Sequence, residues 1–379
     1  QGCLLPGLVA SILPMTMDAE RGTKRPCDEK GQRTKVRIAS GAGTTFGVDD
    51  IAVAYATSGR FWESEGLDIE WVPARGGVKV VEAVLGKNVD AGYGTWVPCV
   101  ASRLDGQPIK ILASMAQALA QNLIVNKERV ASPSDLRGKR WAVDGIGALS
   151  HTLGLLIARG LAIPENEIEW IPAGPPPQRI EQLLNGEADC SLVRVEEAAV
   201  LARQHPDKLA KLLGFEEILP LAPVQPHGVI SVTEDFAKEK PEICAKLVRG
   251  LVRASRSLHD SLEEFRQAVR HHVTERPKEI GDPIEASNEE IATIWEREVA
   301  AGSFAVNGGL SVRHWAASLR MFAALRDGKG TDLTLEDIAL PRLAAPAIAN
   351  LGPAHEGAHD RCDVDGASWT LPLASIVDA

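Results

Sequence analysis

Hydrophobic and polar positions follow the same order in two segments of the chain. Asp68 to Tyr93 (DIEWVPARGGVKVVEAVLGKNVDAGY) and Glu167 to Leu192 (EIEWIPAGPPPQRIEQLLNGEADCSL) align without a gap at a constant offset of 99 residues. The identical pairs are Ile69/Ile168, Glu70/Glu169, Trp71/Trp170, Pro73/Pro172, Ala74/Ala173, Glu82/Glu181, Leu85/Leu184 and Asp90/Asp189. A repeat of this length indicates a repeated structural unit, so we expect two similar lobes with a cleft between them.

Each copy predicts a strand, a helix and a second strand. The first strand is rich in β-branched and aromatic residues and ends at a proline, which cannot donate a hydrogen bond to a neighbouring strand. Apolar residues then recur at helical spacing, and Gly86 or Gly186 falls near the helix end, where a positive φ is favoured. The second strands are Ala91 to Thr95 and Cys190 to Arg194. Units of this length favour a parallel sheet.

The repeat extends upstream of both copies with looser spacing. Lys35 to Ser40 alternates like a strand, and Val48 to Ser64 has the period of a helix. Arg140 to Asp144 and His151 to Gly160 take the same places before the second copy. Each unit is therefore predicted as β-α-β-α-β, with its strand-to-helix loops at the carboxyl edge of the sheet, where ligands of open α/β sheets bind.

Composition narrows the class of protein. The chain has 379 residues, of which 45% are hydrophobic and 24% charged, which is enough for about two domains. Its net charge of -10 and the lack of a Lys/Arg run argue against a nucleic-acid partner. The apolar stretch Cys3 to Met15 is too short to span a bilayer. It resembles the core of an export signal without the preceding basic residues, and a cut or misassigned start is the alternative.

The cysteines and histidines predict no metal site and no cofactor. The six cysteines form no CxxC pair, and no histidine lies at the sequence spacing typical of metal ligands. Cys190 falls in a predicted strand and is interpreted as a small buried residue. Cys99 begins a helix, where either packing or a thiolate role is open.

Two motifs carry a family resemblance. Ser134 to Val143 (SDLRGKRWAV) resembles the DLKGK signature of solute-binding proteins in the nitrate, sulfonate and taurine group, the NMT1/THI5-like superfamily that includes SsuA-like proteins. Leu183 to Asp189 (LLNGEAD) is similar to the motif that precedes a cleft strand in that family. The likeness runs from about Lys35 to Gly352 and leaves residues 353–379 as a separate tail.

The resemblance implies a fold and a function. The fold would be the α/β clamshell of type II periplasmic binding proteins, two β-α-β lobes joined by a two-crossover hinge. Lobe one would comprise residues 35–117 and 224–352, and lobe two residues 118–223, after a disordered leader or linker at 1–34. Such a protein is a periplasmic monomer that captures a small anionic or aromatic solute and presents it to an ABC permease. A cytoplasmic location is the alternative.

Candidate ligand contacts lie in the loops that follow the strands. Thr44, Thr45 and Phe46 precede a helix and would either hold a polar group of the ligand or cap the helix. Gly76 and Gly77 permit close backbone approach where the second copy has prolines. Trp96 could stack on a flat ligand and Arg194 could pair with an anion, or with Glu196 or Glu197 instead. The other candidates are Thr95, Ser150, His151 and His227.

Catalysis is the competing interpretation. The same superfamily contains enzymes, and an aromatic-acid decarboxylase using Arg194, His151 or His227 would leave little trace in the sequence. No trio of nucleophile, base and orienting residue is visible at plausible spacing, so no catalytic residue is predicted. Binding is therefore the favoured function, with the decarboxylase as the alternative.

Overall fold

The computed structural model describes most of the chain between Arg33 and His355. The described residues are 33–41, 46–74, 76–115, 121–218, 220–221, 226–275, 285–300, 302–326, 328, 330, 332–352 and 355. Predictions that fall elsewhere lie outside the described residues. These include Thr44 and Thr45, most of the predicted leader and tail, and residues 116–120 and 222–225 at the two predicted crossovers.

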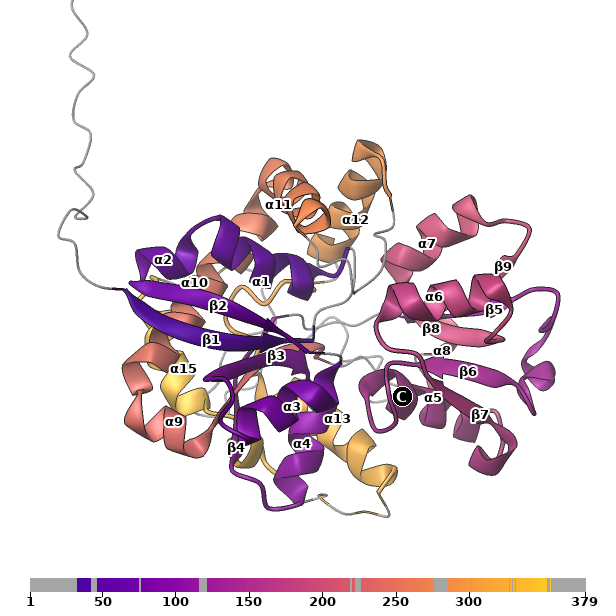
Figure 1. The fold of residues 1–379 in the computed structure, drawn as a ribbon, viewed down its shortest axis with the longest axis horizontal. Helices are drawn as coiled ribbons and strands as arrows, with labels where there is room; N and C mark the ends of the chain where they lie inside the picture. The colour runs from indigo at the N-terminus through magenta and orange to yellow at the C-terminus, as the bar shows by residue number, and fades with distance from the viewer. Residues whose placement is uncertain are drawn as a thin grey trace, which may run out of the picture. The chain divides into compact units, whose positions relative to one another are not determined.

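Two five-stranded sheets share one strand order (Figure 1). The first has the order β2 (Leu67–Pro73), β1 (Thr34–Ser40), β3 (Ala91–Thr95), β10 (Gly228–Thr233) and β4 (Ile109–Ser114). The second has the order β7 (Glu169–Pro172), β6 (Arg140–Val143), β8 (Cys190–Arg194), β5 (Gln121–Asn126) and β9 (Leu209–Leu213). We call the parts built on them lobe one and lobe two. The exact lobe boundaries given by the sequence stay a prediction.

Strand pairing is the same in both sheets. β1 pairs in parallel with β2 and β3, and β6 pairs in parallel with β7 and β8. The third parallel strand of each sheet then meets a strand that runs the other way: β10 beside β3, and β5 beside β8. The chain passes between the sheets from β4 to β5 and returns from β9 to β10. The antiparallel strands therefore come from the segments where the chain changes lobe.

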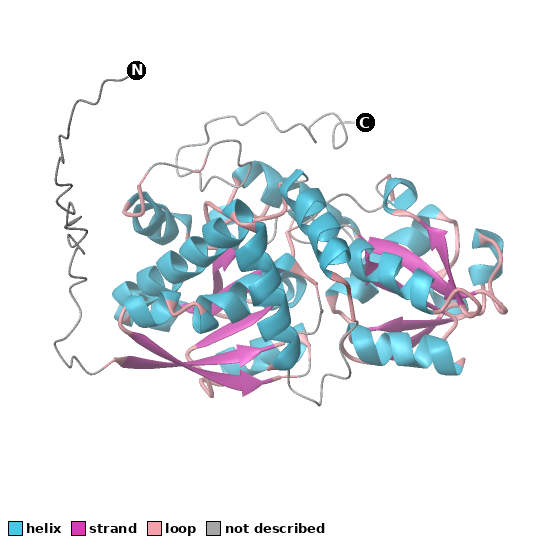
Figure 2. Ribbon diagram, turned by 90° about the horizontal axis from the view of Figure 1, so that it is seen from above, coloured by secondary structure: helices cyan, strands magenta, loops and turns pink. Residues whose placement is uncertain are grey.

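Helices lie on both sides of each sheet (Figure 1), and Figure 2 shows helices in cyan and strands in magenta from above. In lobe one, α1 (Val48–Ser58) and α2 (Phe61–Ser64) lie on one side and α3 (Gly77–Leu85) and α4 (Trp96–Leu104) on the other (Figure 1). Lobe two carries α5 (Leu149–Gly160), α6 (Pro176–Asn185), α7 (Val195–Gln204) and α8 (Phe215–Ile218), with 3-10 turns at Pro133–Leu136 and Glu165–Glu167. After β10 the helices are α9 (Glu234–Glu239), α10 (Pro241–Asp260), α11 (Leu262–Thr274), α12 (Asn288–Ala300), α13 (Val312–Ala324), α14 (Leu335–Ile338) and α15 (Pro341–Ala349).

The predicted repeat units are confirmed with two local differences. The helix expected over Val48 to Ser64 is two helices, because Arg60 adopts a left-handed conformation with φ of 60° and ends the continuous run. Gly86 has a φ of -72°, whereas Gly186 has a φ of 70°. The residue that aligns with Gly186 at the offset of 99 is Lys87, and its φ is 56°. The left-handed position is thus shared by both copies, one residue after Gly86.

The aspartates shared by the two copies support the fold. A carboxylate oxygen of Asp90 accepts a hydrogen bond from the backbone N–H of Arg37 at 2.8 Å. In the second copy, Asp189 accepts from the backbone N–H of Arg140 at 2.9 Å and from its guanidinium at 2.8 Å. Each aspartate lies directly before the third parallel strand of its sheet and therefore ties the start of that strand to its parallel neighbour, β1 or β6.

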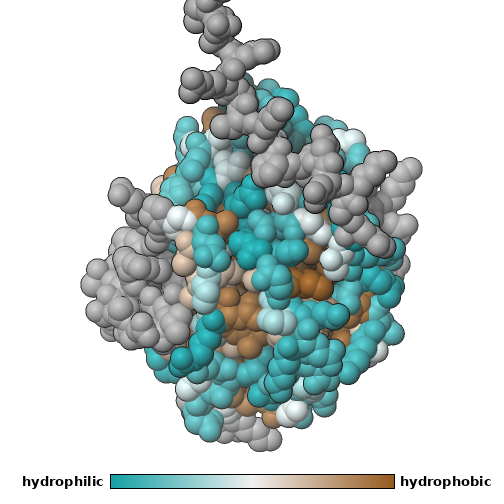
Figure 3. All heavy atoms as spheres, turned by 90° about the vertical axis from the view of Figure 1, so that its left-hand side faces the viewer, coloured by the Kyte–Doolittle hydropathy of each residue, from teal (hydrophilic) through white to brown (hydrophobic). Residues whose placement is uncertain are grey.

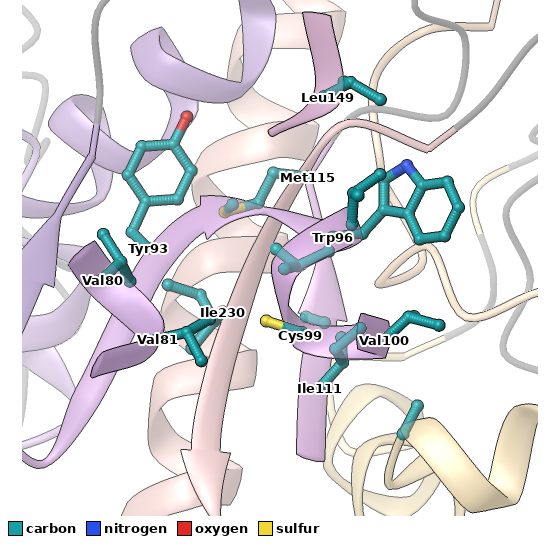
Figure 4. Close-up of a cluster of buried hydrophobic side chains, with 14 of the residues drawn as sticks. Val80, Val81, Tyr93, Trp96, Cys99, Val100, Ile111, Met115, Leu149 and Ile230 are labelled. Atoms are coloured by element: carbon teal, nitrogen blue, oxygen red, sulfur yellow. The ribbon is translucent and has the colours of Figure 1, made fainter. Parts of the chain in front are cut away.

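Two hydrophobic clusters form the core. The larger includes side chains of both sheets, and Figure 4 shows the part of it around Trp96, Cys99 and Ile111. The smaller joins α1 and α11 of lobe one to the helices and strands of lobe two, with Ile51, Phe265 and Val200 among its buried members. α10 packs on lobe one, where the Trp62 indole N–H donates to the Leu247 carbonyl at 2.9 Å. Apolar packing therefore continues from one lobe to the other.

The surface is mixed. On the face shown in Figure 3, polar side chains surround smaller patches of apolar ones among the described residues. No described helix combines the length and the apolar character needed to cross a bilayer.

Candidate functional site

A cavity with several charged residues in its lining lies where the carboxyl edges of the two sheets meet. Its volume is about 60 Å³, and it is lined by residues from both lobes. Lobe one contributes the ends of β1 and β3, the first turns of α1 and α3, and the start of β10, whereas lobe two contributes the loop after β6, the starts of α5 and α6, and the end of β8. The lining residues are Gly41, Asp49, Asp50, Gly76, Gly77, Tyr93, Gly94, Thr95, Gln121, Asp144, Leu149, Ser150, Pro175, Pro176, Arg179, Leu192, Arg194, His227 and Gly228.

An ionic cluster joins the lobes at this cavity. Arg194, at the end of β8, donates from Nη1 to Asp49 Oδ1 at 2.8 Å, and Asp49 belongs to the first turn of α1. His227 Nδ1 contacts the other oxygen of Asp49. The Tyr93 hydroxyl donates to Asp49 Oδ2 at 3.1 Å and also contacts Asp50. Both oxygens of Asp49 are therefore engaged, one by each lobe.

The pKa values of the cluster keep its charges fixed. Burial alone would raise the pKa of Asp49, but His227 and Arg194 hold it well below its usual range. Burial would lower the pKa of Arg194, but the carboxylates of Glu196 and Asp49 outweigh burial and raise this pKa above its usual value. Burial and the adjacent Asp49 and Asp50 carboxylates raise the pKa of Tyr93. Asp49 and Arg194 are thus a charged pair, and Tyr93 stays a neutral hydrogen-bond donor.

A second acidic group lies behind Arg194. Arg194 Nη2 donates to Glu196 Oε1 at 3.5 Å, and Glu196 lies in the first turn of α7. Glu298 of α12 shares a hydrogen bond with Glu196, and burial next to this carboxylate raises the pKa of Glu298 to about 8. The interpretation of Arg194 as a partner of Glu196 is therefore confirmed, with Asp49 as a closer partner that the sequence did not indicate.

On the side of lobe two, the cavity is lined by Arg179, Asp144 and Ser150. Arg179, in the first turn of α6, donates from Nη1 to the Leu192 carbonyl at 2.6 Å and to Ser191 Oγ at 3.0 Å. Its Nη2 lies 3.1 Å from Asp144 Oδ1. Ser150 Oγ accepts from the backbone N–H of Asp144 at 2.8 Å, which fixes the loop between β6 and α5. A buried guanidinium and a carboxylate are thus held at the rim by backbone and hydroxyl groups.

Several cavity residues retain unpaired polar atoms. Thr95 Oγ1, Gln121 Oε1, Arg179 Nε and Arg194 Nε are buried and have no hydrogen-bond partner. A buried polar group without a partner costs about 1–3 kcal/mol, and native proteins leave few such groups. Four of them belong to residues that line one cavity, where a bound solute or water can complete their hydrogen bonds.

Six of the residues predicted from sequence line this cavity. Gly76, Gly77 and Thr95 come from lobe one, Ser150 and Arg194 from lobe two, and His227 from the returning segment before β10. Gly77 has a geometric reason to be glycine, because a Cβ atom there would lie 2.7 Å from Thr95 Oγ1. The structure therefore brings these six residues together at one cavity, and whether they touch a ligand stays a prediction.

Three other predicted residues are packed in the protein interior and do not line the cavity. Phe46 is fully buried in the smaller core cluster. Trp96 is also fully buried, with its ring 5.8 Å from Trp315 and 5.9 Å from Phe322, and Figure 4 shows it within the core. His151 packs on Trp170 at 4.7 Å, and its Nδ1 accepts from the Gly147 N–H. We therefore remove stacking by Trp96 and contact by Phe46 and His151 from the candidate site.

Charged residues that the sequence analysis missed complete the site. Asp49, Asp50, Asp144 and Arg179 line the cavity and were not among the predicted contacts. All four lie in the first turn of a helix or in the loop after a strand, next to candidates that were named. The sequence did contain one indication of their role. These residues lie at the carboxyl edge of the sheets, where strand ends and helix starts come together and where ligands were predicted to bind.

The described thiols are not activated. Burial raises the pKa of Cys99 and of Cys244 to about 12, and burial also raises the pKa of Cys190. Because the thiolate is the nucleophile, these environments suit packing. The packing interpretation of Cys99 and Cys190 follows, and the remaining cysteines lie outside the described residues.

Comparison with known proteins assigns the family. A sequence model described as NMT1/THI5 like matches residues 49–263, which is more than half of the 379 residues. The chain belongs to this NMT1/THI5-like family, as its sequence motifs predicted. No curated protein sequence matches the chain.

Solved structures establish the fold. A protein from Bordetella bronchiseptica RB50 is 18% identical with a TM-score of 0.70, covering 86% of this chain and 100% of its own. The periplasmic nitrate-binding protein NrtA from Synechocystis PCC 6803 is 14% identical with a TM-score of 0.65, covering 85% and 90%. The alkanesulfonate-binding protein SsuA from Xanthomonas axonopodis pv. citri, bound to MOPS, is 17% identical with a TM-score of 0.57, covering 81% and 99%. The predicted two-lobed periplasmic-binding-protein fold is confirmed.

Proposed function

We propose that this protein captures a small polar organic solute in the cavity between its lobes and delivers it to an ABC-type importer. The observation that carries the proposal is the set of unpaired buried atoms of Thr95, Gln121, Arg179 and Arg194 around one cavity. A ligand that hydrogen-bonds to both lobes would complete these groups in the closed state alone. Family membership and the SsuA and NrtA likenesses support the same function.

The charges of the cavity suggest which solutes fit. Asp49, Asp50 and Asp144 face only two guanidinium groups, those of Arg179 and Arg194, with His227 as the remaining basic side chain. Arg194 already pairs with Asp49, and Arg179 already pairs with Asp144. A simple anion would therefore meet cations whose charge is neutralised, in a site with additional carboxylates. A solute with both an anionic group and a cationic or donating group matches this arrangement better.

A matched set of solutes tests the function and the charge preference. Thermal-shift and calorimetric titrations would compare 2-aminoethanesulfonate, ethanesulfonate, ethylammonium and nitrate on the purified protein. We expect saturable binding of the zwitterion and at least tenfold weaker binding of the others. Ethanesulfonate or nitrate binding as tightly would overturn the charge preference. If neither this set nor a wider panel of small polar solutes binds, the binding function itself is wrong.

A conservative variant connects binding to this cavity. Thr95→Val keeps the shape of the side chain and removes the hydroxyl that has no partner in the protein. We expect a loss of about fivefold or more in affinity for the best solute, because one hydrogen bond contributes about 1 kcal/mol. Thr293→Val on the exposed side of α12 is the matched control. Equal affinity of both variants with the wild type would place the solute elsewhere.

The transport role implies a location and a partner. We propose a periplasmic monomer whose two lobes contact the permease. Fractionation of cells that express the intact gene would find the processed protein in the periplasm. Recovery from the cytoplasm alone would contradict the transport role. No observation among the described residues favours the decarboxylase alternative.

A further inference from the structure

Two histidines and an aspartate meet at the end of α10, outside the cavity described above. His259 and Asp260 are the last two residues of this helix, and His355 follows α15, 95 residues further along the chain. His259 Nδ1 lies 2.8 Å from Asp260 Oδ1, and His355 Nε2 lies 2.7 Å from the same oxygen. One ligand atom from each residue lies within 4.8 Å of the others.

Packing holds both imidazole rings in place. The His259 ring lies 4.5 Å from the His355 ring and 5.8 Å from the Phe304 ring. The backbone N–H of His355 donates to Asn307 Oδ1 at 3.1 Å, which fixes the position of the chain at this residue. The two histidine side chains are 24% and 23% exposed, whereas that of Asp260 is 56% exposed. The group is therefore preorganised and still open to solvent on one side.

The end of α10 and Asp260 both place negative charge beside the two imidazoles. α10 has 20 residues, and the carbonyl groups at the carboxyl end of a helix carry the negative end of its dipole. Asp260 adds a carboxylate at the same place. Imidazole nitrogen and carboxylate oxygen are the ligands that zinc and neighbouring divalent transition metals accept.

We propose that His259, Asp260 and His355 form a binding site for a divalent transition-metal ion such as Zn²⁺. The ion would take one nitrogen from each imidazole and one carboxylate oxygen, with water in the remaining positions. Ligand atoms around one ion at about 2.1 Å lie roughly 3–4 Å apart, so small rotations of these partly exposed side chains give coordination distances. The bound ion would link the end of α10 to the chain that follows α15.

Titration of the full-length protein with Zn²⁺ tests the site. After treatment with a chelator, isothermal titration calorimetry is expected to show one ion bound per chain, and thermal unfolding is expected to shift to higher temperature with added Zn²⁺. His259→Ala, His355→Ala and Asp260→Asn should each weaken this binding at least tenfold. His271→Ala, an exposed histidine of α11, should leave it unchanged.

Two results would overturn the proposal. One is a wild-type protein that binds no Zn²⁺ with defined stoichiometry at micromolar concentrations. The other is a His259→Ala/His355→Ala double variant that keeps wild-type affinity, which would assign the binding to other residues. Circular dichroism of the variants without metal would verify that each is folded, and Asp260→Asn keeps the side-chain shape should a histidine variant fail that check.

Discussion

Arg194 Nη1 lies 2.8 Å from Asp49 Oδ1, and both side chains are almost completely excluded from solvent. Arg194 ends a strand of lobe two, and Asp49 lies in the first turn of a helix of lobe one. A charge pair of this kind costs desolvation energy on both sides, so its main effect appears when one partner is removed. This pair connects the lobes at the cavity itself.

Removing either Arg194 or Asp49 should therefore lower the stability of the protein strongly. Arg194→Met leaves Asp49 and Glu196 without their guanidinium, and we expect the free energy of unfolding in urea to fall by about 3–5 kcal/mol. Arg194→Met combined with Asp49→Asn should cost less than the sum of the single changes, because the charges are lost together. Strictly additive losses would show that the pair is not coupled. Arg203→Met, which breaks the exposed pair with Glu290, is the control and should cost less than about 1 kcal/mol.

Glu298 should make stability depend on pH. Burial and the Glu196 carboxylate raise its pKa to about 8 in the folded protein, compared with about 4.3 in an unfolded chain. The folded state holds the proton of Glu298 more tightly than the unfolded chain does. The contribution of this proton to the free energy of unfolding is therefore complete below pH 4.3 and is lost as pH rises to about 8. The expected loss between these values is on the order of a few kcal/mol. Urea midpoints measured from pH 5 to 9 would reveal it.

The variant for this test is Glu298→Gln, which resembles the protonated acid and should flatten the loss of stability above pH 6. Glu289→Gln, an exposed position on the same helix, serves as the control and should keep the wild-type profile. An unchanged slope in Glu298→Gln would mean that another group titrates.

Gly250 should tolerate no side chain. A Cβ atom at this position of α10 would lie 2.2 Å from Cδ1 of Trp62, whose ring is fixed by its hydrogen bond to Leu247. Gly250→Ala is expected to destabilise the protein by about 1–3 kcal/mol through overpacking, although alanine favours helices elsewhere. Thermal unfolding would measure the loss. Gly145→Ala, where a Cβ atom meets nothing within 4 Å, should be nearly neutral.

The left-handed position shared by the two repeats gives a paired prediction. Lys87→Gly should raise the free energy of unfolding by up to about 1 kcal/mol, because a left-handed φ of 56° is unfavourable for lysine. Gly186→Ala should lower it by a similar amount at a φ of 70°. Urea unfolding of both variants tests the pair. A destabilising Lys87→Gly would show that the exposed contact of Lys87 with Asp235 outweighs the backbone strain.

The repeat made the fold predictable from sequence because it fixed strand ends. Pro73 and Pro172 end their strands as expected, and the strands Ala91–Thr95 and Cys190–Arg194 were predicted at their observed bounds. Residues within the strands and directly after them were enough to predict where these strands end. The break at Arg60 was missed because the apolar period continues through it, and only the backbone conformation shows the turn.

The site was harder to predict because its partners are distant in sequence. Asp49 and Arg194 are separated by 145 residues, so neither carries a local sign of the other. Trp96 was misplaced for the opposite reason: a tryptophan after a strand suits stacking on a ligand, but Trp315 and Phe322 supply its neighbours. His259 and His355 were likewise too far apart for their spacing to suggest a metal site.

The hydrophobic cluster that holds Ile51, Val200 and Phe265 has a consequence for how this protein loses its structure. Because these side chains come from both lobes, neither lobe can unfold without exposing apolar surface of the other. The lobes should then melt in one transition, with calorimetric and van't Hoff enthalpies that agree. Cooperativity of this kind would couple the survival of the solute cavity to the integrity of the whole described chain.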